Sequence, residues 1–169
     1  QIERFTKDGV LLKSGRELAA DLIVAATGFN LSALGDITFT VDGQLVDLND
    51  TLSYRGMMLT GLPNLVLVFG YFRASWTLRA DLVADFTCRL LDHMEAVGAA
   101  VVSVAPKPED AGMATGSFVS DEDFNPSYVK RGLHLLPKSG AKPEWQHSQD
   151  YWADKDAIPA IDLNGPELD

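Results

Sequence analysis

The sequence has one cysteine, three histidines and few basic residues, and each shortage excludes a class of protein. Cys88 alone cannot form an internal disulfide or a cysteine-based zinc cage. The histidines are scattered without the spacing of metal ligands, so we expect no metal site. With 14 Lys and Arg against 24 Asp and Glu, the formal net charge is -10. This charge argues against a surface that binds nucleic acid or an anionic membrane.

Long hydrophobic runs are also missing. None approaches the roughly 20 apolar residues that a membrane-spanning helix needs, and the first residues, QIERFTKDG, contain no signal-peptide core. We therefore expect a cytoplasmic protein. The chain begins with Gln1 and enters directly into a pattern that is typical of a strand, so we expect a portion of a longer protein.

What the sequence does contain is a globular composition, with 46% hydrophobic residues in 169. Asp8-Gly9 predicts a hairpin, because a type I′ turn needs positive φ at both central residues. A second turn is expected at Ser14-Gly15. The apolar run LIVAAT that follows favours a strand covered on both faces, and Asp42-Gly43 predicts another hairpin.

A second buried strand is expected from Asn64 to Phe69, and it leads through Gly70 towards a helix. The helix is predicted from a 3.6-residue period and ends near Gly98. Its apolar stripe consists of Leu82, Val83, Phe86, Leu90 and Met94. Arg79 falls within this stripe at the very start of the helix, where it either extends past the edge of the core or contacts a ligand.

The second half of the chain is less regular. Residues 105–127 are rich in Pro, Gly, Ser and acidic residues and are predicted to form a linker or mobile loop. Residues 128–169 form a tail with a short apolar patch, and its last residues, IPAIDLNGPELD, are expected to be disordered.

Two strand exits are candidates for a binding site, because open α/β sheets hold ligands at the carboxyl ends of their strands. The first is Ala26, Thr27 and Gly28, although a simple turn would use the same residues. The second is the helix start in YFRASWTLRADL. There Ser75 or Thr77 is either an ordinary N-cap or a neighbour of a ligand, and Trp76 is either a core residue or a stacking partner.

The order of these motifs resembles the carboxyl-terminal part of the flavin-containing and Baeyer-Villiger monooxygenases. The segments YRGMMLTGLPNL, GYFRASWTLRADL and CRLLDHM look closest to the ethionamide-activating subgroup. The resemblance runs from about Ile2 to His93. It resumes in the tail at YVKRGLHLLPKSG, PEW and QDYWADK, where Tyr128, Arg131, Lys138 and Trp145 are expected to belong to a packing arm.

The resemblance implies an α/β fold, as the last part of a flavoprotein with two Rossmann-like domains that hold FAD and NADPH. It divides the chain into the end of the NADPH domain (1–30), the last part of the FAD domain (31–104), the linker (105–127) and the arm (128–169). Implied residues between the two cofactors are Ala26, Thr27 and Gly28. Implied residues beside the flavin are Gly70, Ser75, Trp76, Thr77 and Leu78, with Arg79 reaching towards the cofactors.

The implied activity is Baeyer-Villiger oxidation of a ketone, or oxygenation of a sulfide or an amine, through a flavin C4a-peroxide. No two glycines here are separated by a single residue, so the GxGxxG phosphate-binding pattern is absent. The isolated chain is therefore predicted to be inactive and to hold no cofactor. Two alternatives remain open: a free-standing interaction or scaffold module, and part of a disulfide-reductase-like flavoprotein. Exposed sheet edges would favour self-association.

Overall fold

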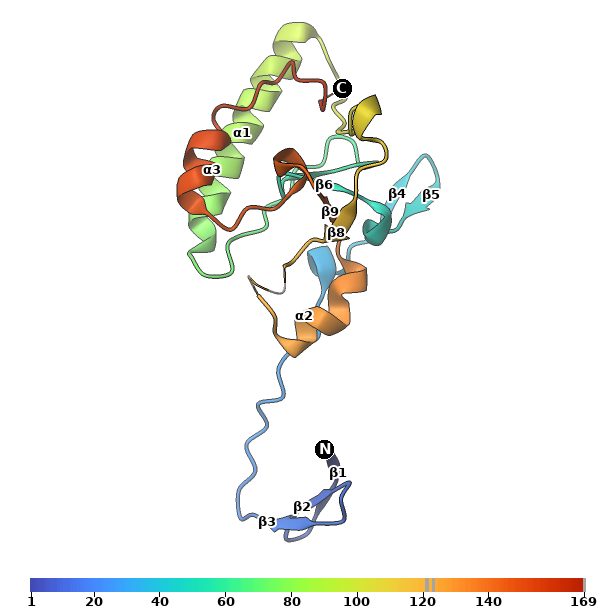
Figure 1. Cartoon of the computed structure of the whole chain (residues 1–169), viewed down its shortest axis with the longest axis vertical. Helices are drawn as coiled ribbons and strands as arrows, with labels where there is room; N and C mark the ends of the chain where they lie inside the picture. The colour runs from blue at the N-terminus through green and yellow to red at the C-terminus, as the bar shows by residue number, and fades with distance from the viewer. Residues whose placement is uncertain (121, 123, 169) are drawn as a thin grey trace.

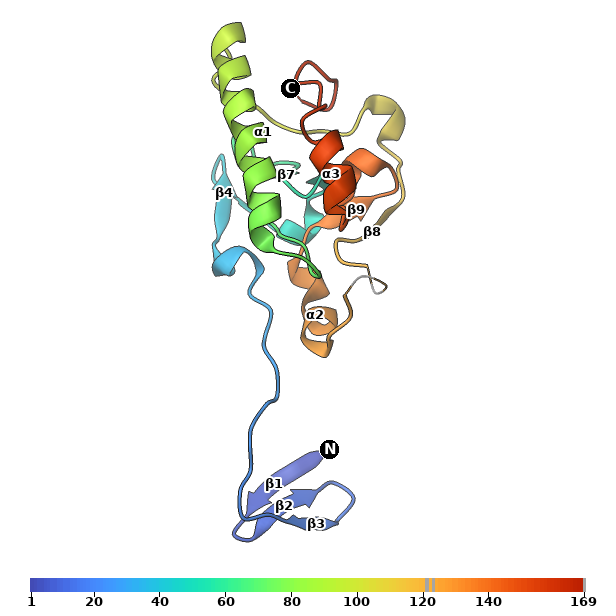
Figure 2. The same ribbon diagram turned by 90° about the vertical axis from the view of Figure 1, so that its left-hand side faces the viewer.

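The computed structural model describes residues 1–120, 122 and 124–168. A small antiparallel sheet at the N-terminus lies apart from a larger body, and an extended segment joins the two (Figures 1 and 2). The strands are β1 (Ile2–Thr6), β2 (Gly9–Leu12), β3 (Glu17–Ala19), β4 (Phe39–Val41), β5 (Gln44–Val46), β6 (Ser53–Tyr54), β7 (Met58–Leu59), β8 (Thr115–Ser117) and β9 (Lys138–Gly140). The α-helices are α1 (Trp76–Val97), α2 (Ser127–Gly132) and α3 (Tyr151–Ala157), and five short 3-10 helices complete the regular structure of the described residues.

The predicted meander at the N-terminus is present as the sheet β1-β2-β3. Its first turn differs from the prediction, because Gly9 is already paired with Thr6 in the ladder and the turn consists of Lys7 and Asp8. A side chain at Gly9 would place its Cβ 1.9 Å from the carbonyl oxygen of Leu18. Close approach of β3 therefore explains this glycine better than a type I′ turn does.

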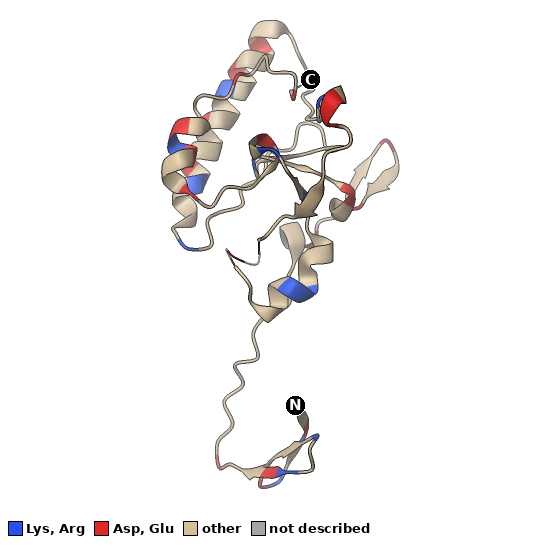
Figure 3. Cartoon of the chain, viewed as in Figure 1, with Lys and Arg blue, Asp and Glu red and all other residues tan. Residues whose placement is uncertain are grey.

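The strand predicted at LIVAAT was wrong. Residues 21–32 form no regular structure, and the side chains of Leu22 and Val24 are 81% and 78% exposed. The run lies in the extended segment between the small sheet and the body, and it carries no charged residue beyond Asp21 (Figure 3). An apolar run forms a buried strand only where neighbouring strands pair with it, and the described chain places none beside it.

The strand predicted from Asn64 to Phe69 was also wrong. This segment is irregular: Asn64 has a φ of 57°, and the backbone N–H of Leu67 donates to the carbonyl of Met57 over 2.8 Å. Leu67 is nevertheless buried in an apolar cluster with Leu59 and Leu62. Leu67 is thus buried without strand pairing, so the apolar pattern of this segment indicates packing in the core and not a strand.

The prediction of the long helix was confirmed. Helix α1 ends at Gly98, which adopts the left-handed conformation with a φ of 70°, as expected of a glycine after a helix. Val83, Phe86 and Leu90 are buried in the main core, and Leu82 and Met94 pack against it. The hairpin at Asp42-Gly43 was confirmed as well, with both residues at positive φ between β4 and β5.

The tail packs onto the body. Trp145 is fully buried and its ring meets that of Tyr54 edge to face at 5.5 Å. The expectation that IPAIDLNGPELD is disordered was wrong for residues 158–168, because Ile158 and Ile161 belong to the main core and Leu168 forms a bridge with Val104. The last residue of the segment, 169, lies outside the described residues. Apolar residues of this tail are buried, and that burial compensates for the entropy lost on ordering.

The range 105–127, which was predicted to be a linker or mobile loop, contains a 3-10 helix (Pro108–Asp110) and β8. Phe118 and Val119 are buried in a second core cluster with Val129 and Leu136. Residues 121 and 123 of that range lie outside the described residues. The described part of the range thus packs against the body at Phe118 and Val119, while β8 itself is exposed.

The fold is α/β, with small antiparallel sheets and three α-helices in the described residues. None of the described helices is long and apolar enough to cross a membrane. Figures 1 and 2 both show α3 lying beside α1, so the tail packs along the long helix.

Candidate functional site

The most promising candidate site is the segment from Phe69 to Arg79, which leads from the irregular apolar run into α1. Gly70 is buried, and a Cβ built there would lie 2.3 Å from Cγ of Trp76. Trp76 therefore packs directly over a backbone that has no side chain. Its ring also meets that of Phe69 at 5.5 Å, yet the residue remains 52% exposed. Trp76 is thus only partly a packing residue and has a free surface.

The N-terminus of α1 is open to solvent. Ser75 occupies the N-cap position, but its side chain makes no capping hydrogen bond to the helix. Its hydroxyl lies 2.7 Å from that of Thr77 instead, and both residues are exposed. The first turn carries no acidic residue. Backbone N–H groups and the positive end of the helix dipole are consequently available to an electron-rich partner.

Arg79 does not extend past the edge of the core, as one sequence interpretation supposed. Its side chain is 1% exposed, and its guanidinium pairs with the carboxylate of Asp154 in α3 and donates to the carbonyl of Arg55. It also lies over the ring of Tyr71 at 5.7 Å. Arg79 is therefore an internal ion-pair partner that joins α1 to the tail.

Tyr71 completes this buried group. Its hydroxyl donates to the same oxygen of Asp154 over 2.8 Å. Burial, together with the hydrogen bond to Asp154, raises the pKa of Tyr71 to about 12. One carboxylate thus holds both the residue after Gly70 and the first turn of α1.

The remaining predicted residues, Ala26, Thr27 and Gly28, lie in the extended segment and are all exposed. Figures 1 and 2 show this segment leaving the body, so the described chain does not bring these residues to the start of α1. Leu78 is half-buried in the first turn of α1, next to Arg79. The structure therefore places the predicted residues from Gly70 to Arg79 close together, and Ala26, Thr27 and Gly28 lie apart from them.

Sequence reasoning missed a hydrogen-bonded chain from the tail. The amide oxygen of Gln149 accepts from the backbone N–H of Phe72 over 2.8 Å, and its amide nitrogen lies 3.0 Å from Nδ1 of His147. Nε2 of His147 lies 3.2 Å from the carbonyl oxygen of Phe69. Because a carbonyl only accepts, Nε2 carries the proton and Nδ1 accepts from Gln149.

This geometry requires a neutral imidazole. A proton on Nδ1 of His147 would face the NH₂ of Gln149, so two donors would oppose each other. Burial is the main cause that lowers the pKa of His147 to about 3, and the nearby charge of Arg79 lowers it further. The three scattered histidines gave no signal of this role, since the partners of His147 are distant in sequence.

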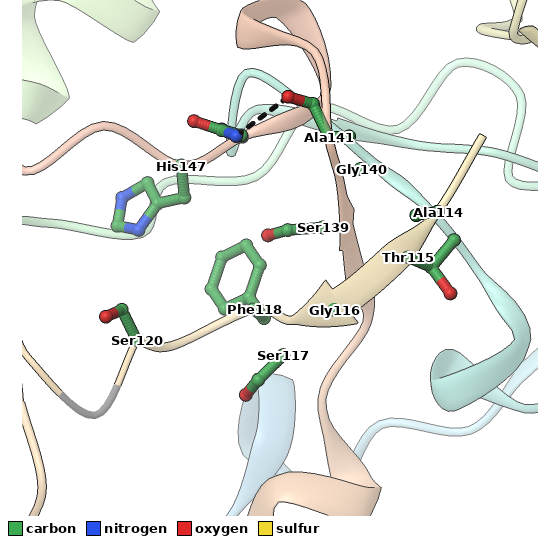
Figure 4. A pocket seen from close by; sticks show the side chains of 11 residues that line it. Ala114, Thr115, Gly116, Ser117, Phe118, Ser120, Ser139, Gly140, Ala141 and His147 are labelled. Atoms are coloured by element: carbon green, nitrogen blue, oxygen red, sulfur yellow. Dashed lines mark hydrogen bonds between the residues drawn. The ribbon is translucent and has the colours of Figure 1, made fainter.

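Next to His147 lies an open pocket of about 420 Å³ between β8, β9 and the tail (Figure 4). Among the described residues no charged one lines it, and four residues with a hydroxyl do: Thr115, Ser117, Ser120 and Ser139. The rings of Phe118 and His147 stack at 5.0 Å on one side of it. Phe118 also contacts Phe69 at 5.0 Å, so the wall of this pocket adjoins the segment that leads into α1.

Comparison with known proteins identifies the origin of this arrangement. The chain is 48% identical over 156 residues to the FAD-containing monooxygenase EthA of Mycobacterium tuberculosis and 44% identical over 153 residues to EthA of Mycolicibacterium smegmatis. It is 37% identical over 158 residues to the "Probable FAD-binding monooxygenase AlmA" of Acinetobacter baylyi. No family model and no solved structure matches the sequence.

These matches cover 90% of the chain for the two EthA proteins and 94% for AlmA. The chain spans only about 30% of the length of these relatives. The resemblance that the sequence motifs predicted is confirmed. The chain therefore belongs to the EthA-like FAD-containing monooxygenases, as a portion that matches about 30% of their length.

Proposed function

We propose that this chain supplies one wall of the flavin site in an FAD- and NADPH-dependent monooxygenase. The proposed reactions are Baeyer-Villiger oxidation of a ketone and oxygenation of a sulfide or an amine. The observation that carries the proposal is the open N-terminus of α1, which has no side-chain cap and no acidic residue in its first turn. The names of the relatives, which are FAD-containing or FAD-binding monooxygenases, support the same cofactor.

The residues present fit one edge of a flavin. The pyrimidine side of a reduced flavin gains negative charge, and the exposed first turn at Ser75, Trp76 and Thr77 offers N–H donors and a partial positive charge to it. Gly70 keeps the preceding backbone free of a side chain, and Trp76 keeps an exposed face beside it. FAD, when bound, supplies the redox chemistry, and the chain orients it and excludes water.

The predicted residues of the extended segment have a different role in this proposal. Ala26, Thr27 and Gly28 are proposed to lie between FAD and NADPH, where a backbone with small side chains permits close approach of both cofactors. Their exposure in the extended segment is compatible with a partner surface that the chain itself does not provide. Arg79 is not needed as a cofactor ligand here, because its guanidinium is engaged by Asp154.

The chain alone is proposed to hold FAD weakly and to have no turnover. Its glycines are too widely spaced for a GxGxxG phosphate site, so the pyrophosphate of FAD has no dedicated partner. The test compares two samples: the purified chain, and the chain fused to the part of M. tuberculosis EthA that it does not match. Both are incubated with FAD and desalted, and the visible spectrum and NADPH oxidation with a ketone or a sulfide are recorded.

We expect the fusion to retain a yellow, stoichiometric flavin and to oxidise NADPH, and the chain alone to do neither. A fusion that folds but retains no flavin would refute the proposed function. Stoichiometric flavin on the chain alone would refute the weaker claim, that this chain cannot hold FAD without further residues.

One observation favours a second behaviour of the isolated chain, which is self-association. Leu22, Val24 and Phe29 are strongly exposed along the extended segment, and the outer strands β1 and β3 have free edges within the described sheet. Exposed apolar segments and strand edges pair readily with another copy. Light scattering after size exclusion tests this: we expect a dimer or larger species, and a strict monomer up to high concentration would contradict it.

A further inference from the structure

The tail contacts the segment before α1 at two places, and these contacts surround the residues assigned to the flavin edge. The first place is the chain of His147 and Gln149, which ends on the carbonyl of Phe69 and the N–H of Phe72. Both backbone groups flank Gly70. The tail therefore fixes the two ends of a very short stretch of backbone, and this stretch cannot shift without breaking a hydrogen bond.

The second place is Asp154 in α3. Its carboxylate accepts from the hydroxyl of Tyr71 and from the guanidinium of Arg79, so it lies between the residue after Gly70 and the first turn of α1. Arg79 is 1% and Asp154 is 7% exposed. Breaking such a buried pair leaves an uncompensated charge, so the arrangement resists displacement.

The rest of α1 is held by the main core and by a further contact with the tail. Phe86 and Leu90 lie in the main core, and Arg89 donates to the carbonyl of Ile158 over 2.8 Å. The first turn, in contrast, is exposed at Trp76 and Thr77 and has no side-chain cap. The exposed end of the first turn lacks this core packing, so the position of the helix start depends on the contact between Arg79 and Asp154.

We propose that Gln149 and Asp154 are positioning residues that hold the start of α1 at the flavin edge. The inference rests on the proposed function, because only that function gives the helix start something to face. Neither residue touches the cofactor; each acts through the segment from Phe69 to Arg79. Loss of either contact displaces the helix dipole from the pyrimidine side of the flavin and weakens its stabilisation of the reduced form.

The first part of the test uses the chain alone. Hydrogen exchange is compared for the unaltered chain, for Asp154→Asn and for Asp156→Asn, a matched control because Asp156 lies in the same helix but is exposed. We expect the amides of residues 80–83, which are protected by donating to the carbonyls of the opening turn of α1, to exchange at least about tenfold faster in Asp154→Asn, with amides around Phe86 unchanged. Equal exchange in the two variants would overturn the coupling between the tail and the helix start.

The second part uses the fusion with the remainder of EthA and measures the midpoint potential of the bound flavin. Asp154→Asn removes a negative charge, which by itself would make the potential more positive. Displacement of the helix start makes it more negative, and Tyr71→Phe and Gln149→Leu should do the same without any change of charge. A more negative potential in all three variants, with Asp156→Asn unaltered, supports the positioning role.

The outcomes separate the two proposals. If the unaltered fusion folds but binds no flavin, the proposed function fails and this role fails with it. If the unaltered fusion binds flavin and the three variants keep its potential, or shift it only in the direction of the lost charge, the positioning role alone is overturned. A variant that loses flavin is compared by hydrogen exchange, where an unchanged helix start also overturns the role.

Discussion

Lowering the pH should destabilise this chain through one histidine, His147. Its pKa in the folded state is lowered to about 3, while an unfolded histidine protonates near 6.5. The unfolded chain therefore binds a proton that the folded chain does not bind. The contribution of His147 to the free energy of unfolding is fully present above pH 6.5 and declines as the pH falls towards 3. Each pH unit in this window costs about 1.4 kcal/mol, so the loss at pH 4 relative to pH 7 is about 3 kcal/mol.

The structural reason is the chain of hydrogen bonds described above. Protonation would place Nδ1–H against the amide NH₂ of Gln149 and a positive charge near Arg79, in a site that is almost closed to water. Replacing His147 with Gln removes the titrating group and keeps a donor that can reach the carbonyl of Phe69. The substitution should reduce the pH dependence even if it lowers stability at pH 7.

The assay is urea unfolding followed by circular dichroism at pH 7 and pH 4, with the free energy of unfolding compared between the two. Carboxylates also titrate in this range, so the relevant quantity is the difference between proteins. The control is His134→Gln, because His134 is exposed. We expect the control to lose as much stability as the unaltered chain and His147→Gln to lose about 3 kcal/mol less. Equal losses in all three proteins would refute the assignment of a neutral, buried His147.

Three further predictions concern the same body. Between pH 10 and 12 the chain should lose stability, because the pKa of Tyr71 is raised from 10.0 to about 12; Tyr71→Phe should flatten this decline in denaturant titrations. Gly70→Ala should cost roughly 1–3 kcal/mol by forcing the indole off the backbone, whereas Gly112→Ala, where the space is open, should cost far less by the same titration. Phe86→Ala should cost about 3–5 kcal/mol and Leu91→Ala, on the exposed face, less than about 0.5; comparable shifts in thermal melting would contradict the assigned core.

The sequence predicted α1 well because the apolar spacing and the terminal glycine that define a helix lie within a short stretch of sequence. Val83, Phe86 and Leu90 recur at helical spacing, and Gly98 ends the pattern with a backbone conformation that glycine adopts readily. The same is true of the hairpin at Asp42-Gly43, where both residues have positive φ. Each of these elements needs only information from neighbouring residues.

The two predicted strands failed because a strand needs partners that a short apolar run does not specify. The run LIVAAT has no strand beside it and is exposed, whereas the run before Gly70 is packed without a ladder. Both runs have the composition of a buried strand. Pairing is a property of the assembled sheet, so composition alone could not distinguish these two outcomes from a strand.

Arg79 is the instructive case for the candidate site. A cation within an apolar helical stripe is costly to bury unless a counter-charge meets it, so the stripe itself required a carboxylate somewhere in the fold. That carboxylate is Asp154, 75 residues away, within the segment QDYWADK that already resembled the family's ending. The sequence predicts a packing arm for this part of the tail, and the ion pair with Arg79 gives the motif a more specific role. The tail is the part of the chain that fixes where α1 begins, and any function assigned to the start of α1 therefore depends on the tail.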